Sequence, residues 1–405
     1  MKTKHILVVS QIFYPEQTRA IDICKEWMKR GYKVTVLTGI PNYPVGKFYK
    51  GYNWFHKRKE SYEKVEIIRI PIIPRGNNFI QLSFNYLSFV FSGFFWSKFT
   101  RTKVDSIFVY AVSPITQALP GLWFAKRRKI PCYLYVLDLW PENVQMITGI
   151  SKGRFIDILK KLVRYIYKHC DRIFISSKAF RQSIMSHNVP FEKIEFWPQY
   201  AEDFYGKLSS EEVSIKEIPQ DGKTNIIFAG NIGYAQGLEI LPEVAEILKG
   251  KTVPVRFNII GDGRYKPELI EEVEKKGVAD MFNFISQRPA SEISSFMAVC
   301  DGALITLGKS EVLSNTIPAK LQSCLSCGIP IIASADGEVQ RIVKEAEAGM
   351  CSDASDVTVL ASNIEKFIKL GDNDKTIMAE NALKYSNKHF NKEKLFEQID
   401  KHFEL

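Results

Sequence analysis

The chain has 405 residues, of which 45% are hydrophobic and 25% charged, so it holds enough apolar side chains for two folded domains. Its net charge of +10 favours an anionic partner: nucleic acid, a phosphorylated small molecule or acidic lipid headgroups. Seven scattered cysteines argue against a disulfide framework and favour a reducing compartment. The opening residues MKTKHILVVSQIFYPE indicate a strand and a turn, not a secretory signal, so we expect a cytoplasmic protein.

Short apolar segments alternate with helix-like segments through the first half of the chain. The predicted strands are HILVVS, KVTVLTG, VEIIRIPII, SIFVYAV, CYLYVLDL, RIFISS and KIEFW. Continuous apolar strands separated by helices are typical of a parallel sheet that is covered on both faces.

The same pattern begins again after a polar stretch at about residues 201–223, which we predict to be a linker. The predicted strands are now NIIFAGN, RFNIIGDG, MFNFISQ, GALITLG and PIIAS. The predicted fold class is therefore α/β, with two doubly wound domains at residues 1–200 and 201–385. Ligands of such sheets bind beyond the carboxyl ends of the strands, so we expect a cleft between the domains.

An aromatic segment at residues 77–103, NNFIQLSFNYLSFVFSGFFWSKFTRTK, breaks the alternation. Its polar side chains interrupt the apolar run, so it does not predict a transmembrane helix. One interpretation is a helix packed against the first sheet. The other is an interfacial helix, with Lys98, Arg101 and Lys103 beside acidic headgroups and the basic HKRK at residues 56–59 nearby.

Several chemistries lack their motifs. The first strand leads into SQIFYPEQTRA, which has no glycines for a dinucleotide fingerprint, and no Walker A sequence is present. The six histidines stand alone, and Cys324 and Cys327 lack the second pair that a zinc site needs, so we expect no metal and no cofactor. Lysine and arginine are spread without an aromatic-basic motif, so we expect no nucleic-acid partner.

The segment VLDLWPENVQ places two carboxylates, Asp138 and Glu142, after a predicted strand. At this position they can orient a hydroxyl group or accept its proton. The alternative is structural: Asp138 as a helix cap and Glu142 in the first turn of that helix, near its positive end.

The segment SNTIPAKLQSCLSCGIPIIAS, residues 314–334, predicts a turn, a helix that ends at Gly328 and a buried strand. Pro318 suits the first helical position, Lys320 follows, and no acidic residue lies between Glu311 and Asp336. Such a helix start is suited to an anion. With FAGNIGYAQG and ISQRPASE, it places glycines, amides and helix starts where a diphosphate can bind.

Five ordered motifs then resemble those of family 4 glycosyltransferases, in the bacterial branch that builds O antigens, capsules and other surface glycans. The motifs are the segment from FYPEQTRAIDICKEW to GKFYKGY, then DLWPENV, FAGNIGYAQGLE, IIGDG and TIPAKLQSCLSCGIPIIAS. The resemblance covers nearly the whole chain and implies the GT-B fold, with two Rossmann-like domains facing a cleft. It also implies a C-terminal helix, at about residues 386–405, that packs back on the first domain.

For function, the resemblance implies transfer of a sugar from a nucleotide donor, with retention and without a metal. The donor would bind the second domain, with its diphosphate at the helix that starts near Ile317, and the acceptor would bind the first domain. The sequence departs from the family pattern at four positions. Two frequent glutamates correspond to Asn315 and Ser323, and a frequent Arg and Lys correspond to Asn231 and Gln236.

We expect Lys320 and the amides of its helix to compensate for the missing cations. The predicted donor-binding residues are Gly230, Asn231, Gly233, Gln236, Arg264, Arg288, Lys309, Asn315, Thr316, Lys320, Leu321 and Ser323.

On the acceptor side, Asp138 is the candidate for orienting the acceptor hydroxyl, and Glu142 is the second catalytic candidate. Glu16 and Gln17 are expected to line the same cleft.

The predicted donor is a nucleoside-diphosphate sugar, most simply UDP-linked, with N-acetylated amino and deoxy sugars among the candidates. The predicted acceptor is a polyprenyl-diphosphate-linked glycan at the inner face of the cytoplasmic membrane. The alternative function is a non-catalytic subunit that binds the sugar nucleotide for a membrane glycosyltransferase. A GT-B epimerase is disfavoured because no supporting carboxylate-histidine set is found.

Overall fold

The computed structural model describes residues 3–76, 78–209 and 213–404. The chain divides into two compact units. The first contains Met1–Trp197 together with Phe396–Leu405, and the second contains Pro198–Leu395. The boundary between the units, after Trp197, lies close to the predicted end of the first domain at residue 200. Residues 210–212 of the predicted linker lie outside the described residues.

The first unit is built on one eight-stranded sheet with the order β3-β4-β2-β1-β5-β6-β7-β8. Its strands are β1 (His5–Val9), β2 (Lys33–Gly39), β3 (Lys59–Tyr62), β4 (Val65–Ile70), β5 (Ser106–Ala111), β6 (Cys132–Val136), β7 (Arg172–Ile175) and β8 (Ile194–Phe196). Its helices are α1 (Arg19–Lys29), α2 (Phe79–Phe99), α3 (Ala118–Arg128), α4 (Glu142–Thr148), α5 (Arg154–His169) and α6 (Phe180–Ser186).

This sheet agrees with the predicted strands except at one edge. Strand β3 was not predicted, and it pairs antiparallel with β4, so the sheet is not wholly parallel. Its sequence, KESY, is polar and its side chains are exposed or half-buried, so it carries no apolar signal. The inner strands β5 and β6 are fully buried, as expected for strands covered on both faces.

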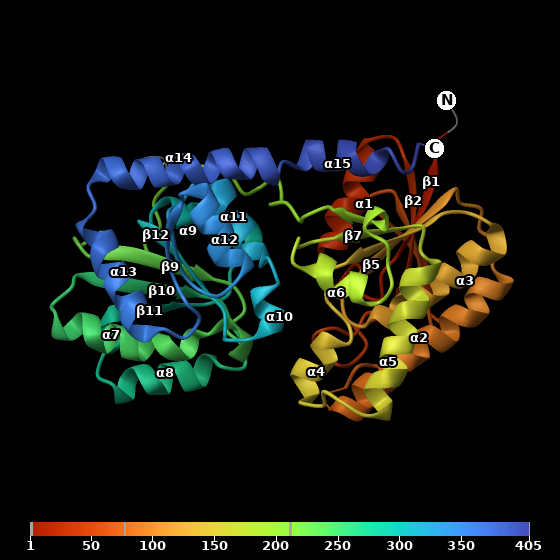
Figure 1. The fold of residues 1–405 in the computed structure, drawn as a ribbon, viewed down its shortest axis with the longest axis horizontal. Helices are drawn as coiled ribbons and strands as arrows, with labels where there is room; N and C mark the ends of the chain where they lie inside the picture. The colour runs from red at the N-terminus through yellow and green to blue at the C-terminus, as the bar shows by residue number, and fades with distance from the viewer. Residues whose placement is uncertain (1–2, 77, 210–212, 405) are drawn as a thin grey trace. The chain divides into compact units, whose positions relative to one another are not determined.

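Helices α2, α3 and α5 cover one face of the first sheet (Figure 1). The opposite face is closed by α1 and by the C-terminal segment, residues 396–404. Trp27 of α1 packs edge-on against Phe403 at 5.1 Å and donates from Nε1 to Asp400 at 3.2 Å. The last helix, α15 (Lys392–Asp400), therefore packs its end on the first unit, although it begins at Lys392 and not near residue 386.

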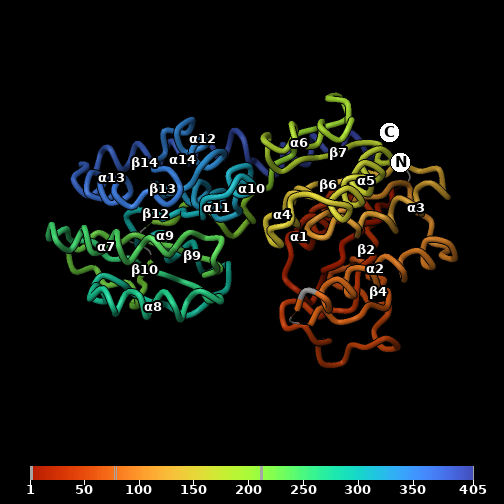
Figure 2. The backbone as a smooth tube through the Cα atoms, turned by 60° about the horizontal axis from the view of Figure 1, so that its bottom comes forward, coloured from red at the N-terminus to blue at the C-terminus, as the bar shows by residue number. Residues whose placement is uncertain are grey.

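The second unit contains a six-stranded parallel sheet with the order β11-β10-β9-β12-β13-β14. The labels β14, β13, β12, β9 and β10 follow one another in this order in Figure 2, with β14 and β10 on opposite sides of β9 and β12. The strands are β9 (Thr224–Ala229), β10 (Val255–Ile260), β11 (Phe282–Ile285), β12 (Gly302–Thr306), β13 (Ile331–Ser334) and β14 (Gly349–Ser352). The helices are α7 (Leu241–Gly250), α8 (Lys266–Lys275), α9 (Ile293–Ala298), α10 (Glu311–Ser314), α11 (Ala319–Cys327), α12 (Glu338–Ala346), α13 (Val357–Lys369) and α14 (Asp372–His389).

Each sheet has one point at which the direction of strand addition reverses. In the first unit this point lies between β1 and β5, whose registers begin with Ile6 opposite Ser106. In the second unit it lies between β9 and β12, where Gly302 lies opposite Ile226. Loops diverge at the carboxyl ends of such strand pairs, and ligands of doubly wound sheets bind there. The fold thus marks one candidate site in each unit.

Candidate functional site

The candidate site of the second unit begins with two loops that follow β9 and β12. The amide of Gly308 donates to the carbonyl of Ala235 at 3.1 Å, which ties the loops together. Gly237 has φ +67°, and a Cβ atom there would lie 2.7 Å from the carbonyl carbon of Leu307. Only glycine permits this approach, so residue 237 sets the distance between the loops.

Helix α11 supplies the third element of this site. It begins at Ala319, one residue later than the predicted first position, Pro318, which is instead its N-cap with extended backbone. Residues 311–314 form the separate helix α10. No described side chain caps α11, and the Leu321 amide donates to the Pro318 carbonyl at 3.0 Å. An anion at this helix start would therefore meet the amides of Ala319 and Lys320. The predicted end is confirmed: Gly328 closes the helix with φ 63°.

Lys320 lies at the centre of the three elements. Its Nζ donates to Oε1 of Gln236 and lies 3.9 Å from the ring centroid of Phe228 in β9. A Cβ atom at Gly230 would lie 3.7 Å from the same nitrogen, so the lysine reaches the carboxyl end of β9. The half-buried ammonium has no carboxylate partner among the described residues, and burial lowers the pKa of Lys320 to about 7. The structure thus brings Gly230, Gln236 and Lys320 together.

The other predicted cations lie in different surroundings. Lys309 and Arg264 are exposed, in the loops after β12 and β10, and Asn231 is exposed in the loop after β9. Arg288 follows β11 at the edge of the sheet and forms an ion pair with Glu217 at 2.6 Å. Because its charge is already paired and its strand is remote from β12, Arg288 is less suited to a diphosphate than Lys320.

The remaining donor-side residues are largely engaged by the backbone. Asn315 closes α10, and the hydroxyl of Thr316 donates to Val312 at 2.9 Å. Leu321 is fully buried, and Ser323 is only 3% exposed, with its hydroxyl bonded to the Ala319 carbonyl at 3.2 Å. Gly233 precedes the short turn that carries Gln236. The predicted ribose contact of Ser323 stays a prediction.

In the first unit, Asp138 follows β6 as predicted, but it does not cap α4, whose N-cap is Pro141 without a side-chain bond. Its Oδ2 instead accepts from the backbone amide of Ser113 at 2.7 Å, in the loop after β5. The Ser113 hydroxyl in turn accepts from Nε1 of Trp140 at 3.0 Å. The half-buried carboxylate therefore lies at the carboxyl edge of β5 and β6, beside the point where the strand order reverses.

Glu142 has different neighbours from Asp138. It is the first residue of α4, and its Oε1 accepts from the hydroxyl of Ser183 in α6. Its Oε2 is buried without a hydrogen-bond partner in the described chain. The structure therefore does not bring the two predicted catalytic carboxylates into one hydrogen-bonded pair.

Glu16 is almost fully buried, at 2% exposure, whereas Gln17 is exposed. The Glu16 carboxylate accepts from the amides of Asn42 at 2.7 Å, Tyr43 at 2.6 Å and Phe13 at 3.3 Å. The pKa of Glu16 is raised, because the effect of burial exceeds the opposing effect of these amide bonds. In this structure Glu16 joins the loops after β1 and β2, and its predicted acceptor role stays a prediction.

Two residues of these sites were not identified from the sequence. Phe228 supplies the ring beneath Lys320, and Ser113 holds Asp138. Phe228 lies within a predicted apolar strand, so nothing in the sequence distinguishes it from the other apolar residues there. Ser113 had one signal, namely its position directly after a predicted strand that borders the first one in a doubly wound sheet.

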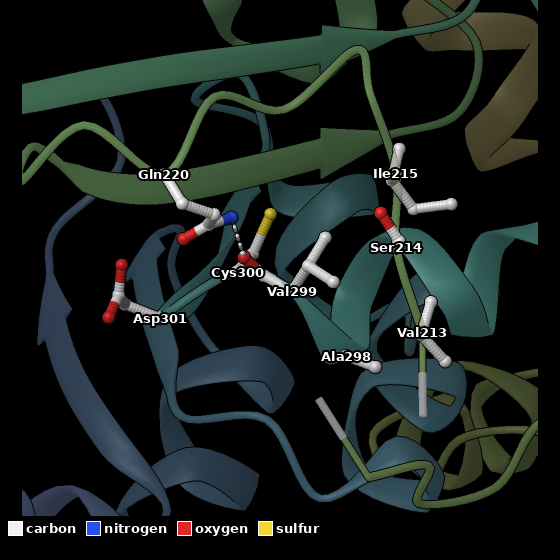
Figure 3. Close-up of a pocket in the computed structure, with 8 residues that line it drawn as sticks. All are labelled: Val213, Ser214, Ile215, Gln220, Ala298, Val299, Cys300 and Asp301. Carbon is white, nitrogen blue, oxygen red and sulfur yellow. Dashed lines mark hydrogen bonds between the residues drawn. The ribbon is translucent and has the colours of Figure 1, made fainter. Parts of the chain in front are cut away.

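The cavity drawn in Figure 3 is not the donor site. It has a volume of about 390 Å³ and lies beside Gln220, which donates to the Val299 carbonyl at 3.0 Å. Its wall includes Cys300 and Asp301, immediately before β12. It therefore opens at the amino edge of the second sheet, opposite to the loops that hold Lys320.

Two family models match the chain and together extend over most of it. Residues 17–199 match the model described as Glycosyltransferase Family 4, and residues 209–385 match the model described as Glycosyl transferases group 1.

Curated relatives are similar over much of the chain. The probable glycosyltransferase WbjE of Pseudomonas aeruginosa is 27% identical over 313 residues, 73% of this chain and 75% of that protein. The putative colanic acid biosynthesis glycosyl transferase WcaI of Escherichia coli K12 is 24% identical over 391 residues, 92% of each chain.

Solved structures share the fold. Anabaena Alr3699/HepE, in complex with UDP and glucose, superposes with a TM-score of 0.70 at 15% identity over 100% of both chains. WaaG, a glycosyltransferase involved in lipopolysaccharide biosynthesis, gives 0.66 at 13% identity over 98% of each chain. Two Rossmann-like units, these GT-B neighbours and the two family models lead to one assignment. The chain belongs to the family 4 glycosyltransferases.

Proposed function

We propose that this protein transfers a sugar from a UDP-sugar, with retention and without a metal, to a polyprenyl-diphosphate-linked glycan during surface polysaccharide synthesis. The observation that carries the donor half is the ammonium of Lys320, which has no carboxylate partner among the described residues and lies beside the start of α11 and Gly230. As the glycosyl bond breaks, negative charge accumulates on the leaving diphosphate, and these groups are placed to stabilise it. HepE bound to UDP, and WbjE and WcaI by their described activities, support the proposal.

The test is a thermal-shift screen against nucleoside diphosphates and their sugars, followed by a transfer assay. We expect UDP and one UDP-sugar to raise the melting temperature, and the purified protein to hydrolyse or transfer that sugar. Proton NMR of the product tests retention, and activity in the presence of EDTA tests metal independence. Tight donor binding without any turnover would favour the non-catalytic subunit, an alternative motivated by Asn315 and Ser323 at the two glutamate positions.

The pKa of Lys320 gives the donor site an expected pH dependence. A diphosphate favours the charged lysine, so binding raises a pKa that lies near 7 without ligand. The affinity for UDP should therefore fall as the pH rises from 7 to about 9, by up to about tenfold per pH unit. UDP itself is fully ionised in this window, since its last phosphate proton has a pKa near 6. Calorimetry across the window should show this fall in the wild type and a flat profile in Lys320→Met.

Membrane association, the second part of the proposal, is supported by α2. Its inward face is mixed: Phe89 is fully buried in the core of the first unit, Asn85 accepts from Gln11 at 2.7 Å, and Ser92 donates to the Pro71 carbonyl at 2.6 Å. Its outward face is apolar, with Phe91 67% and Phe99 78% exposed. The exposed apolar side chains of this face are Ile80, Phe84, Leu87, Phe91, Phe94, Phe95 and Phe99.

Helix α2 thus packs on the first sheet, as the first interpretation predicts, and its exposed aromatic face supports the interfacial interpretation, which stays a prediction. Within the described ranges, no helix combines the length and the apolar character needed to cross a membrane. A helix that exposes an aromatic face beside basic side chains is suited to lie at the headgroup level. The acceptor lipid would then be reached at the surface.

We expect the protein to sediment with vesicles that contain acidic lipid and to dissociate in high salt. Replacing Lys98, Arg101 and Lys103 together with glutamine should weaken binding by about 1 kcal/mol per charge at most. As a matched control, glutamine at the exposed lysines 275, 384 and 388 of the second unit should leave binding unchanged. Equal binding to neutral vesicles would contradict the electrostatic part of this prediction.

A further inference from the structure

A second cavity lies in the first unit, in walls formed by α4, α5 and the end of α6, three helices that lie near one another in Figure 2. Its volume is about 280 Å³. Glu142 and Gln145 of α4, Lys160 and Arg164 of α5, and His187 after α6 line it. The cavity lining therefore begins at Pro141, three residues after Asp138, on the same carboxyl side of the first sheet.

The inner wall of this cavity holds buried polar atoms that lack partners. Oε2 of Glu142 and Nδ1 of His187 have no hydrogen-bond partner among the described residues, and His187 is only 7% exposed. The ring of Tyr167 packs edge-on against His187 at 5.7 Å, and its buried hydroxyl also lacks a partner. Buried polar groups are costly unless they are hydrogen-bonded. Tyr167 lies behind the wall and does not line the cavity, so the groups that match the hydroxyl groups of a sugar are the Glu142 carboxylate oxygen and the His187 imidazole nitrogen.

The outer wall carries positive charge. Lys160 and Arg164 are one helical turn apart on α5 and form no ion pair in the described part of the chain. Burial lowers the pKa of His187, the charge of Glu142 raises it, and the charges of Arg164 and Lys160 lower it, so both cations lie close to the imidazole. A lysine and an arginine presented together favour a phosphate group.

Apolar side chains continue from the same wall. Directly after Gln145, α4 and the following loop expose Ile147 at 71% and Ile150 at 47%. Gln145 donates to the Ser151 carbonyl at 3.0 Å and holds this loop against α4. Polar, cationic and apolar surfaces thus follow one another across this part of the first unit.

We propose that this cavity binds a glycosyl phosphate. Glu142 and His187 accept and donate hydrogen bonds to the sugar hydroxyls, while Lys160 and Arg164 hold the phosphate. The inference rests on the proposed function for the source of the ligand, which is the sugar-phosphate end of the lipid-linked acceptor, with its lipid against Ile147 and Ile150. Glu142 is then a residue for acceptor binding and not a proton acceptor in the reaction.

The experiment uses the full chain and the methyl ester of galactose 1-phosphate as the probe, titrated by calorimetry. Lys160→Gln and Arg164→Gln should each weaken its binding by about 5- to 10-fold, since each removes one charge-assisted contact that is partly screened. Lys161→Gln is the matched control, because Lys161 lies on the same helix, is exposed and does not line the cavity. Glu142→Gln should weaken the sugar phosphate and leave inorganic phosphate unaffected or slightly tighter. In spectra of ¹⁵N-labelled histidine, the His187 signals should shift on titration.

The geranyl ester of galactose 1-diphosphate, compared with the methyl ester of the same diphosphate, distinguishes the two sources of ligand. The two esters carry the same charge, and the diphosphate is the linkage of the proposed acceptor. Tighter binding of the geranyl ester, lost in Ile147→Ser, supports a lipid-linked acceptor. Equal affinity of the two esters overturns that source and leaves a soluble sugar phosphate. Absence of binding at millimolar concentration, or binding that Lys320→Ala removes while Arg164→Gln does not, overturns the site itself. None of these results depends on whether UDP binds the second unit, which the Lys320 variants test separately.

Discussion

Asp138→Asn is expected to lower turnover by about 10²- to 10⁴-fold with little change in the affinity for UDP, the range typical of lost general-base assistance. Asparagine retains an oxygen that can accept from the Ser113 amide, so the bond that positions the loop after β5 is preserved. What the substitution removes is the negative charge and the basicity of the side chain. A residue that orients the acceptor hydroxyl acts mainly in the transition state, so turnover and not donor affinity should change.

The structure offers a matched control for this variant. Asp171 accepts from the amide of Cys132 at 2.7 Å, with the same kind of bond as Asp138, but at the amino edge of β6. Asp171→Asn should therefore leave turnover unchanged. If Asp138→Asn also keeps its rate and loses about 1 kcal/mol of stability or less, the carboxylate only ties two loops together. Rate and melting temperature should be measured on both variants.

The inner parts of both sheets were predictable because their strands are apolar throughout. Strand β2 begins and ends where KVTVLTG predicts, and the helix end at Gly328 follows from the need for a left-handed residue. The edge strands β3 and β14 were missed because their short, partly exposed sequences carry no continuous apolar run. The outward aromatic face of α2 was foreseen only as one of two interpretations, since a sequence does not tell which face of a helix meets the sheet.

The donor site was partly predictable because some of its features are local in the sequence. Glycine at position 230 and a lysine at a predicted helix start are local signals, and they point to an anion. The contact of Lys320 with Gln236 and Phe228 joins residues far apart in the sequence, and only the order of β9 and β12 places them together. His187, likewise, stands alone in the sequence, and the packing of α6 against α5 gives it its neighbours.

Lys320→Ala is expected to weaken the binding of UDP by about 10- to 100-fold, the equivalent of one charge-assisted hydrogen bond of about 1.5–3 kcal/mol. The positions that often carry Arg and Lys are Asn231 and Gln236 here, and Gln236 contributes an oxygen to the Lys320 ammonium. Because a diphosphate would replace this neutral partner with a charged one, Lys320 should carry an unusually large share of the charge compensation.

Two further variants separate charge from packing at this position. Lys320→Met keeps an apolar stem over Phe228 and should lose as much UDP affinity as Lys320→Ala, because both remove the charge. Ser323→Ala should lose much less, nearer 1 kcal/mol or below, since its buried hydroxyl already bonds to the Ala319 carbonyl. If UDP binds Lys320→Met as tightly as the wild type, the diphosphate lies elsewhere, and the exposed Arg264 is the next cation to replace, followed by the paired Arg288.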